Sequence, residues 1–154
     1  MKNFTTFIVG LFITNCSIAQ ISPNQFNTPV NTGSNMTLGI NTDDLDDFIG
    51  SSLAAFNAEG NCIGLEIIQN QFFSMAIWGD DTGTPEIDGL QDGENATFAV
   101  LTNDGRVITI ADLANFNGYV TNSLVVTNTI TLFGCTNDEF LEFHTQGYTA
   151  DVDN

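Results

Sequence analysis

The chain has 154 residues, of which 19 are acidic and two are basic, and its formal net charge is −17 at pH 7. A surface with so few Lys and Arg side chains repels phosphate groups, so the composition excludes nucleic acid and anionic lipid as partners. The chain is nevertheless 42% hydrophobic and contains 13 Phe. This apolar content predicts a packed core and argues against an acidic disordered chain.

The first 19 residues have the features of a secretory signal peptide. Lys2 supplies the positive charge at the start, and residues 4–13 are mostly apolar. Residues 17–19 have the small-x-small pattern of a cleavage signal before Gln20. The apolar stretch is too short for a membrane anchor. We therefore expect a secreted or cell-surface protein that does not insert into a membrane after cleavage. Lipidation at Cys16 is an alternative, although the residue before this cysteine is a poor match to a lipidation signal.

Short apolar runs separated by turn residues make up the rest of the chain. Residues 20–35, rich in Asn, Thr, Pro and Ser, predict an extended N-terminal arm. About eight short strands in residues 36–154 predict one all-β domain, an antiparallel β-sandwich of Ig-like or jelly-roll-like type with about seven to nine strands. The expected strands are 36–41, 52–56, 62–68, 72–78, 96–101, 106–110, 118–120 and 123–133.

Turn and helix signals add detail to this pattern. Asn103-Asp104-Gly105 predicts a hairpin between the strands at 96–101 and 106–110. Residues 43–48 suit either a single helical turn, because carboxylates favour a helix N-terminus, or a solvated loop. Residues 111–116 are another short helical candidate, and neither segment is long enough to form a helical layer.

Two cysteines, Cys62 and Cys135, follow the leader. In an oxidising compartment such a pair predicts a disulfide that closes a long loop between the early and late parts of the domain. Two separately buried thiols are the alternative. Spacing alone does not distinguish them, because a disulfide requires the two sulfur atoms to meet.

A loop punctuated by Gly and Pro follows the strand at 72–78 and contains six carboxylates. Ca²⁺ takes six to eight oxygen ligands, so this acidic loop is a candidate calcium site. Its spacing does not match the EF-hand pattern, and a solvated turn shaped by Asp, Gly and Pro is the alternative. The acidic cluster at 43–47 is a weaker candidate. The candidate ligands are Asp80, Asp81, Thr82, Glu86, Asp88, Asp92 and Glu94.

Three aromatic residues beside this loop, Trp78, Phe72 and Phe73, are a candidate platform on which sugar rings could stack. Packing in the core is the alternative for side chains of a strand this apolar. Catalysis has little support, because His144 is the single histidine and no nucleophile motif accompanies it. We therefore do not expect an enzyme.

Four segments together resemble a known module: residues 50–64, 75–81, 84–90 and 93–94. They are similar to a β-sandwich module of secreted and cell-surface, adhesin-like proteins of the Bacteroidetes, in which IGAF…G.CVG, WGDD…TPE.DG and GE recur in this order. The resemblance covers roughly residues 48–101. It implies an extracellular, non-catalytic module.

The sequence therefore predicts a secreted, non-catalytic β-sandwich module for extracellular binding or adhesion, with an acidic loop that is ordered by Ca²⁺ or stays solvated. The expected partners are an extracellular glycan or protein, or further copies of the chain. The alternative is a structural subunit of an extracellular fibre or surface assembly. In that case the arm or a strand edge would add to a neighbour's sheet.

Overall fold

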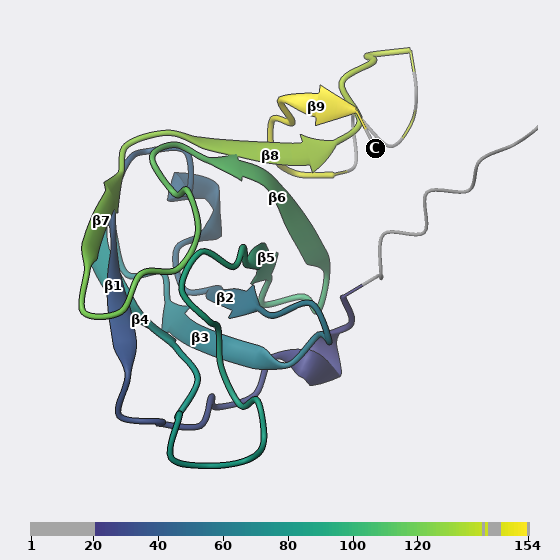
Figure 1. The fold of residues 1–154 in the computed structure, drawn as a ribbon. Helices are drawn as coiled ribbons and strands as arrows, with labels where there is room; N and C mark the ends of the chain where they lie inside the picture. The colour runs from purple at the N-terminus through teal and green to yellow at the C-terminus, as the bar shows by residue number, and fades with distance from the viewer. Residues whose placement is uncertain (1–20, 140, 142–145, 154) are drawn as a thin grey trace, which may run out of the picture.

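The protein is described here from a computed structural model that covers residues 21–139, 141 and 146–153. The expected leader, Cys16 and His144 lie outside the described residues. Nearly all regular structure is β, arranged as one sheet of three strands and one of six (Figure 1). The predicted all-β sandwich with seven to nine strands is thus confirmed. Within the described residues, no helix has the length and apolar character needed to cross a membrane.

The described part of the chain contains nine strands and two short 3-10 turns. The strands are β1 (Asn35–Asn41), β2 (Ser52–Phe56), β3 (Cys62–Ile67), β4 (Phe72–Trp78), β5 (Thr97–Leu101), β6 (Val107–Leu113), β7 (Leu124–Thr127), β8 (Ile130–Gly134) and β9 (Val152–Asp153), and the turns are η1 (Pro23–Gln25) and η2 (Asp46–Phe48).

The smaller sheet has the order β4-β1-β7 and the larger has the order β3-β2-β5-β6-β8-β9. Most neighbours are antiparallel, but β1 pairs with β7 and β8 pairs with β9 in parallel. Among the described strands the chain changes sheet five times: from β1 to β2, from β3 to β4, from β4 to β5, from β6 to β7 and from β7 to β8. Gly64 in β3 permits a close approach to β4 of the other sheet, because a Cβ at this position would lie 2.9 Å from the carbonyl oxygen of Ala76.

The main core lies between the two sheets and follows from the alternation of side chains along each strand. In β1 every second residue is fully buried, and these residues are in register with the buried side of β4. The larger sheet supplies the opposite wall through β2, β5, β6 and β8. The residues of these six strands that belong to the main core are Met36, Leu38, Ile40, Leu53, Ala55, Met75, Ile77, Phe98, Val100, Ile108, Ile110, Leu113, Ile130 and Leu132.

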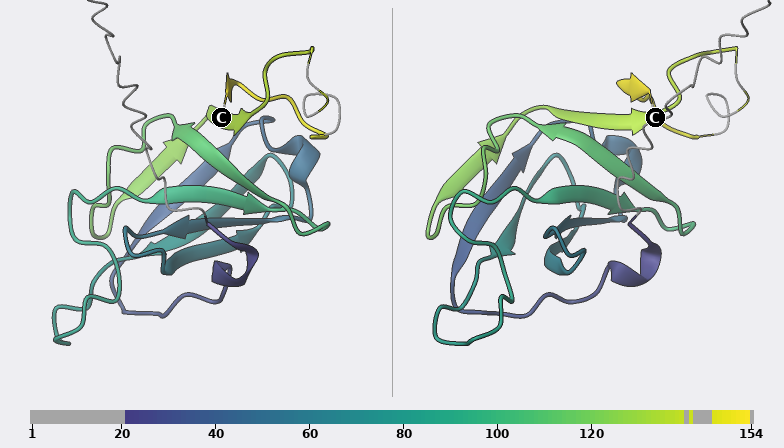
Figure 2. Two further views of the ribbon diagram at one scale, coloured as in Figure 1. Left: turned by 90° about the vertical axis from the view of Figure 1, so that its right-hand side faces the viewer. Right: turned by 45° about the vertical axis from the view of Figure 1, so that its right-hand side comes forward.

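A second, smaller core forms where the N-terminal arm covers the other face of the six-stranded sheet. Phe26 meets Phe56 edge to face with ring centroids 5.2 Å apart, and Gln25 Nε2 donates a hydrogen bond of 2.9 Å to the Gly60 carbonyl oxygen. Figure 2 shows the purple arm running beside β2 and β3. This coverage explains why Ala54 and Ala99, on the face away from the main core, are fully buried. The arm is packed against its own domain.

Several expected elements differ from the structure. The single run at 123–133 is two strands, because the chain bends at residues 128–129 to leave the smaller sheet for the larger one. Residues 118–120 are not a strand, and 111–113 continue β6 instead of forming a helix. The hairpin between β5 and β6 is confirmed, and 46–48 form the single helical turn that the sequence allowed. Strand β9 was not expected.

Candidate ligand-binding face

The acidic loop is closed at its base by backbone hydrogen bonds. Leu90 N–H donates to the Trp78 carbonyl over 3.2 Å, and Asp80 N–H donates to the Leu90 carbonyl over 2.9 Å. The two chain segments approach so closely that a Cβ at Gly89 would overlap the carbonyl group of Gly79. Glycine at position 89 is therefore a steric requirement of the loop.

Three carboxylates order the loop from within. Asp80 Oδ1 accepts the N–H of Asp88 (3.2 Å), and Asp88 Oδ1 accepts the N–H of Asp81 (3.1 Å). Asp81 Oδ1 in turn accepts the N–H of Gly83 over 2.8 Å. Carboxylates that accept backbone N–H groups in this way shape turns, as Asp commonly does.

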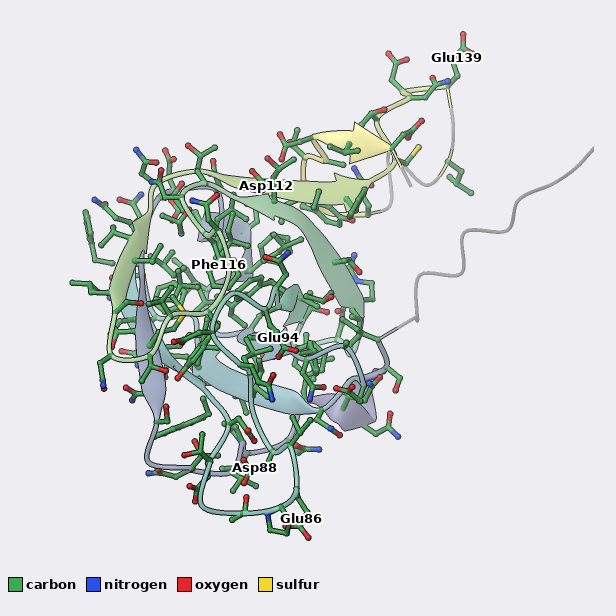
Figure 3. The ribbon with its side chains drawn as sticks, viewed as in Figure 1. Glu86, Asp88, Glu94, Asp112, Phe116 and Glu139 are labelled. Atoms are coloured by element: carbon green, nitrogen blue, oxygen red, sulfur yellow. The ribbon has the colours of Figure 1, made fainter. Side chains whose placement is uncertain are left out.

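The remaining acidic residues of the loop lie apart from this group. Asp92 Oδ1 accepts the N–H and the hydroxyl of Thr121, at 2.8 and 3.0 Å. Glu94 Oε2 accepts the N–H of Gln91 over 2.9 Å. Glu86 is exposed at the tip of the loop, away from Glu94 (Figure 3).

The predicted ligands therefore do not converge on one point. Thr82 is exposed, and among the described residues no three His, Cys, Asp or Glu side chains are grouped so that they could hold a metal ion. Each of Asp80, Asp81, Asp88, Asp92 and Glu94 already has a backbone partner within the protein. The calcium site stays a prediction from the sequence.

Tyr119 is a further aromatic residue of this region, and it packs inside the protein. It is 1% exposed, its hydroxyl lies 3.1 Å from Ser34 Oγ, and its ring occupies the space where Gly79 would carry a side chain. Its backbone pairs with the end of the acidic loop, since Gly93 N–H donates to the Tyr119 carbonyl and Tyr119 N–H to the Glu94 carbonyl, both over 2.8 Å. The loop is thus fixed to the body of the sandwich at both ends.

The aromatic platform divides between two faces. Phe73 points inward and packs against the main core, so it does not belong to an exposed platform. Phe72 is 66% exposed and Trp78 is half-buried, and both lie on the side of the smaller sheet that points away from the core. They stand six residues apart on one strand, a separation of about 20 Å.

We call this side of the β4-β1-β7 sheet the outer face; its three strands lie at the left of Figure 1. Besides its two aromatic residues it presents Leu124 and Val126, which are 68% and 47% exposed. None of its ten residues is charged, although the chain contains 19 acidic residues. The outer face consists of Asn35, Thr37, Gly39, Asn41, Phe72, Ser74, Ala76, Trp78, Leu124 and Val126.

The predicted disulfide is not formed. Cys62 and Cys135 are both free thiols. Cys62 begins β3 and Cys135 follows β8, and four strand spacings separate these strands in the larger sheet, roughly 19 Å at ordinary spacing. A disulfide needs Cα atoms within about 7 Å. Burial raises the pKa of the Cys62 thiol, while hydrogen bonds with backbone groups act in the opposite direction.

Comparison of the chain with protein-family models, with curated proteins and with solved structures gave no match. The fold and the faces described above therefore define the class by themselves: an all-β sandwich that carries an internally ordered acidic loop and an uncharged, partly apolar outer face. Any function has to be argued from these surfaces.

Proposed function

We propose that the protein is a secreted, non-catalytic β-sandwich module for extracellular binding or adhesion, and that the outer face is its contact surface. The observation that carries this proposal is the absence of charge from all ten residues of that face in a chain with 19 acidic residues. Exposed apolar side chains gathered on one face, with polar residues around them, mark interaction sites.

The exposed side chains offer enough binding free energy for a specific contact. Complete burial of a side chain such as Phe72 or Leu124 is worth about 1.5–3 kcal/mol relative to exposure. Both are now about two-thirds exposed, at 66% and 68%, so a ligand that covers them gains most of that free energy. An aromatic ring also prefers a flat, apolar surface against its face.

The dimensions of the outer face favour a glycan over a protein partner. Its longest strands have seven residues, about 23 Å, and the three strands span about 10 Å. The resulting area of a few hundred Å² is smaller than the roughly 800 Å² that each partner buries in a stable protein complex. A neutral glycan lying along β4 would contact Phe72 and Trp78, with the hydroxyl of Ser74 between them.

The polar side chains of this face are available to such a ligand. Within the described part of the chain, the side chains of Asn35, Thr37, Asn41 and Ser74 make no hydrogen bond to the protein. Hydroxyl and amide groups can both donate to and accept from sugar hydroxyls. The face thus combines apolar contact with neutral hydrogen-bonding groups.

Binding of the purified protein to a glycan array and to immobilised extracellular proteins tests the proposal. Phe72→Ala and Trp78→Ala should each weaken binding about tenfold, equivalent to about 1.4 kcal/mol. Ile87→Ala is the matched control, because Ile87 is 63% exposed on the acidic loop, away from the outer face. Equal binding by all three variants and the unmodified protein would refute the outer face as the contact surface. Large assemblies that shrink when residues 21–35 are removed would favour the fibre subunit instead.

A further inference from the structure

A cleft of about 350 Å³ lies at the end of the β5–β6 hairpin opposite its turn. Its residues come from the start of β5, the end of β6, the loop after β6 and strand β8. None of them belongs to the outer face or to the acidic loop. Besides the buried Phe98, the lining contains two aromatic residues, Phe116 and Phe133, and four polar ones, Asn95, Thr97, Thr109 and Asp112.

An irregularity in β6 shapes this cleft. Ile110 pairs with Leu132 and Asp112 pairs with Thr131, so Ala111 is an extra residue in the ladder. Such a β-bulge bends the strand and redirects the side chains next to it. Figure 3 shows Asp112 and Phe116, which come from the end of β6 and the loop that follows it.

The loop that carries Phe116 is held in place by the protein itself. Phe116 meets Phe98 edge to face, with ring centroids 5.0 Å apart, and its N–H donates to the Leu113 carbonyl over 3.1 Å. Asn115 adopts the left-handed conformation, with φ of 71°, and its Nδ2 donates to the Val126 carbonyl over 3.1 Å. The cleft is therefore formed before any ligand arrives, which lowers the entropy cost of binding.

The polar groups of the cleft lack partners, unlike those of the acidic loop. The side chains of Asn95, Thr97, Thr109 and Asp112 make no hydrogen bond or ion pair with any described residue. A pocket with apolar walls and a few convergent polar groups is the usual form of a small-molecule site. Its volume is at the lower end of the range of about 300–1,000 Å³ for such sites.

The chemistry of the lining defines the ligand. The Asp112 carboxylate, in a chain of net charge −17, repels phosphates and carboxylates. Two aromatic rings suit a ring with an apolar face. Three neutral side chains with hydroxyl or amide groups suit several hydroxyls, and the carboxylate forms charge-assisted hydrogen bonds with hydroxyl donors. We propose that the cleft binds a neutral sugar residue, as a second site independent of the outer face.

The test is NMR titration of the isotope-labelled protein with glucose, galactose, mannose and the disaccharides cellobiose and maltose. Choline and glucuronate serve as a cationic and an anionic probe. At least one neutral sugar should cause saturable shifts of the backbone amides of Thr97, Thr109 and Asp112. Failure of every neutral sugar to shift these amides would overturn the proposal. So would stronger shifts with choline or with glucuronate.

Three variants assign the binding to this cleft. Asp112→Ala alters an exposed side chain and should weaken the affinity about tenfold, and Thr109→Val, which keeps the shape of the side chain, should weaken it about threefold. Phe116→Ala should abolish binding. If loss of the contact with Phe98 unfolds this variant, Asp112→Ala and Thr109→Val still test the site. Ile87→Ala, on the acidic loop and outside both proposed sites, should leave the sugar affinity unchanged. Unchanged affinity in both Asp112→Ala and Thr109→Val would refute the site.

Discussion

Asp80 and Asp88 bind each other's chain segment at the base of the acidic loop. Asp80 Oδ1 accepts the N–H of Asp88 over 3.2 Å, and Asp88 Oδ1 accepts the N–H of Asp81 over 3.1 Å. This exchange replaces part of the hydrogen bonding that a regular strand pair would supply. The loop carries six carboxylates between residues 78 and 94, and it is ordered because most of them accept bonds from its own backbone.

The other carboxylates of the loop repel the negative charge of Asp88, and this repulsion alone would make its removal favourable. Substitution of Asp88 should nevertheless destabilise the protein, because its side chain accepts a backbone hydrogen bond. Asp88→Ala leaves the partly buried N–H of Asp81 without its partner, and we expect a loss of about 1 kcal/mol in the free energy of unfolding. Urea denaturation measures it. Glu86→Ala at the exposed tip is the control and should change the stability by less than about 0.5 kcal/mol. Equal effects of the two variants would contradict a structural role for Asp88.

Gly89→Ala should lower the free energy of unfolding more than Asp88→Ala does. The added Cβ would overlap the carbonyl group of Gly79 and crowd the N–H of Asp80 at 2.7 Å, so the base of the loop would have to open. We expect a loss of about 2–4 kcal/mol in the free energy of unfolding. The control is Gly83→Ala, where the nearest atom is an oxygen of the Asp81 side chain at 3.0 Å. A Gly89 variant as stable as the Gly83 variant would show that the two segments lie farther apart than described.

Strands between clear turn signals could be predicted well from the sequence. The expected bounds of β2 and β4 agree with the structure, because each is an apolar run limited by polar turn residues. The run at 123–133 could not be divided correctly, since the bend between β7 and β8 depends on pairing with two distant strands. Strand β9 has two residues and exists only through its contact with β8.

The candidate sites were less predictable than the strands. Alternation indicates that Phe72 and Phe73 face opposite sides, but the sequence does not say which side is the core. Register with β1 decides this, because Phe73 pairs with the buried Ile40. The cleft depends on the bulge at Ala111 and on segments that meet only in the folded sheet. Neither leaves a local signal in the sequence.

The calcium proposal predicts a higher melting temperature in the presence of the ion. A ligand that binds only the native state stabilises it, by about 1.4 kcal/mol at a free concentration ten times its Kd. Thermal unfolding in 5 mM CaCl₂ and in EDTA measures the difference, with MgCl₂ as the control for ionic strength. Asp80→Asn should remove the calcium effect if the ion binds in the acidic loop. Identical melting curves in calcium and EDTA would rule out the proposal.

The two thiols should react at very different rates. In the native protein Cys135, which is half-buried, should react with a thiol reagent well before the buried Cys62. Burial raises the pKa of Cys62, so its reactive thiolate is also scarcer at neutral pH. Between the ordinary thiol pKa and the raised pKa of Cys62, this thiol is deprotonated in the unfolded state but still protonated in the folded state. The free energy of unfolding should therefore fall as the pH rises through this range. Detection of a Cys62–Cys135 disulfide by mass spectrometry would contradict the structure.

Removal of the Phe26 ring should lower the stability without changing the oligomeric state. Phe26 packs on Phe56 over the face of the larger sheet that also buries Cys62. Phe26→Ala should cost about 1–3 kcal/mol in the free energy of unfolding, and Cys62 should react faster because the arm that covers it is loosened. Val30→Ala is the matched control on the same arm, since Val30 is 64% exposed. Size-exclusion chromatography should give the same elution volume for both variants and the unmodified protein. A shift to smaller species in Phe26→Ala would instead mean that the arm holds copies of the chain together.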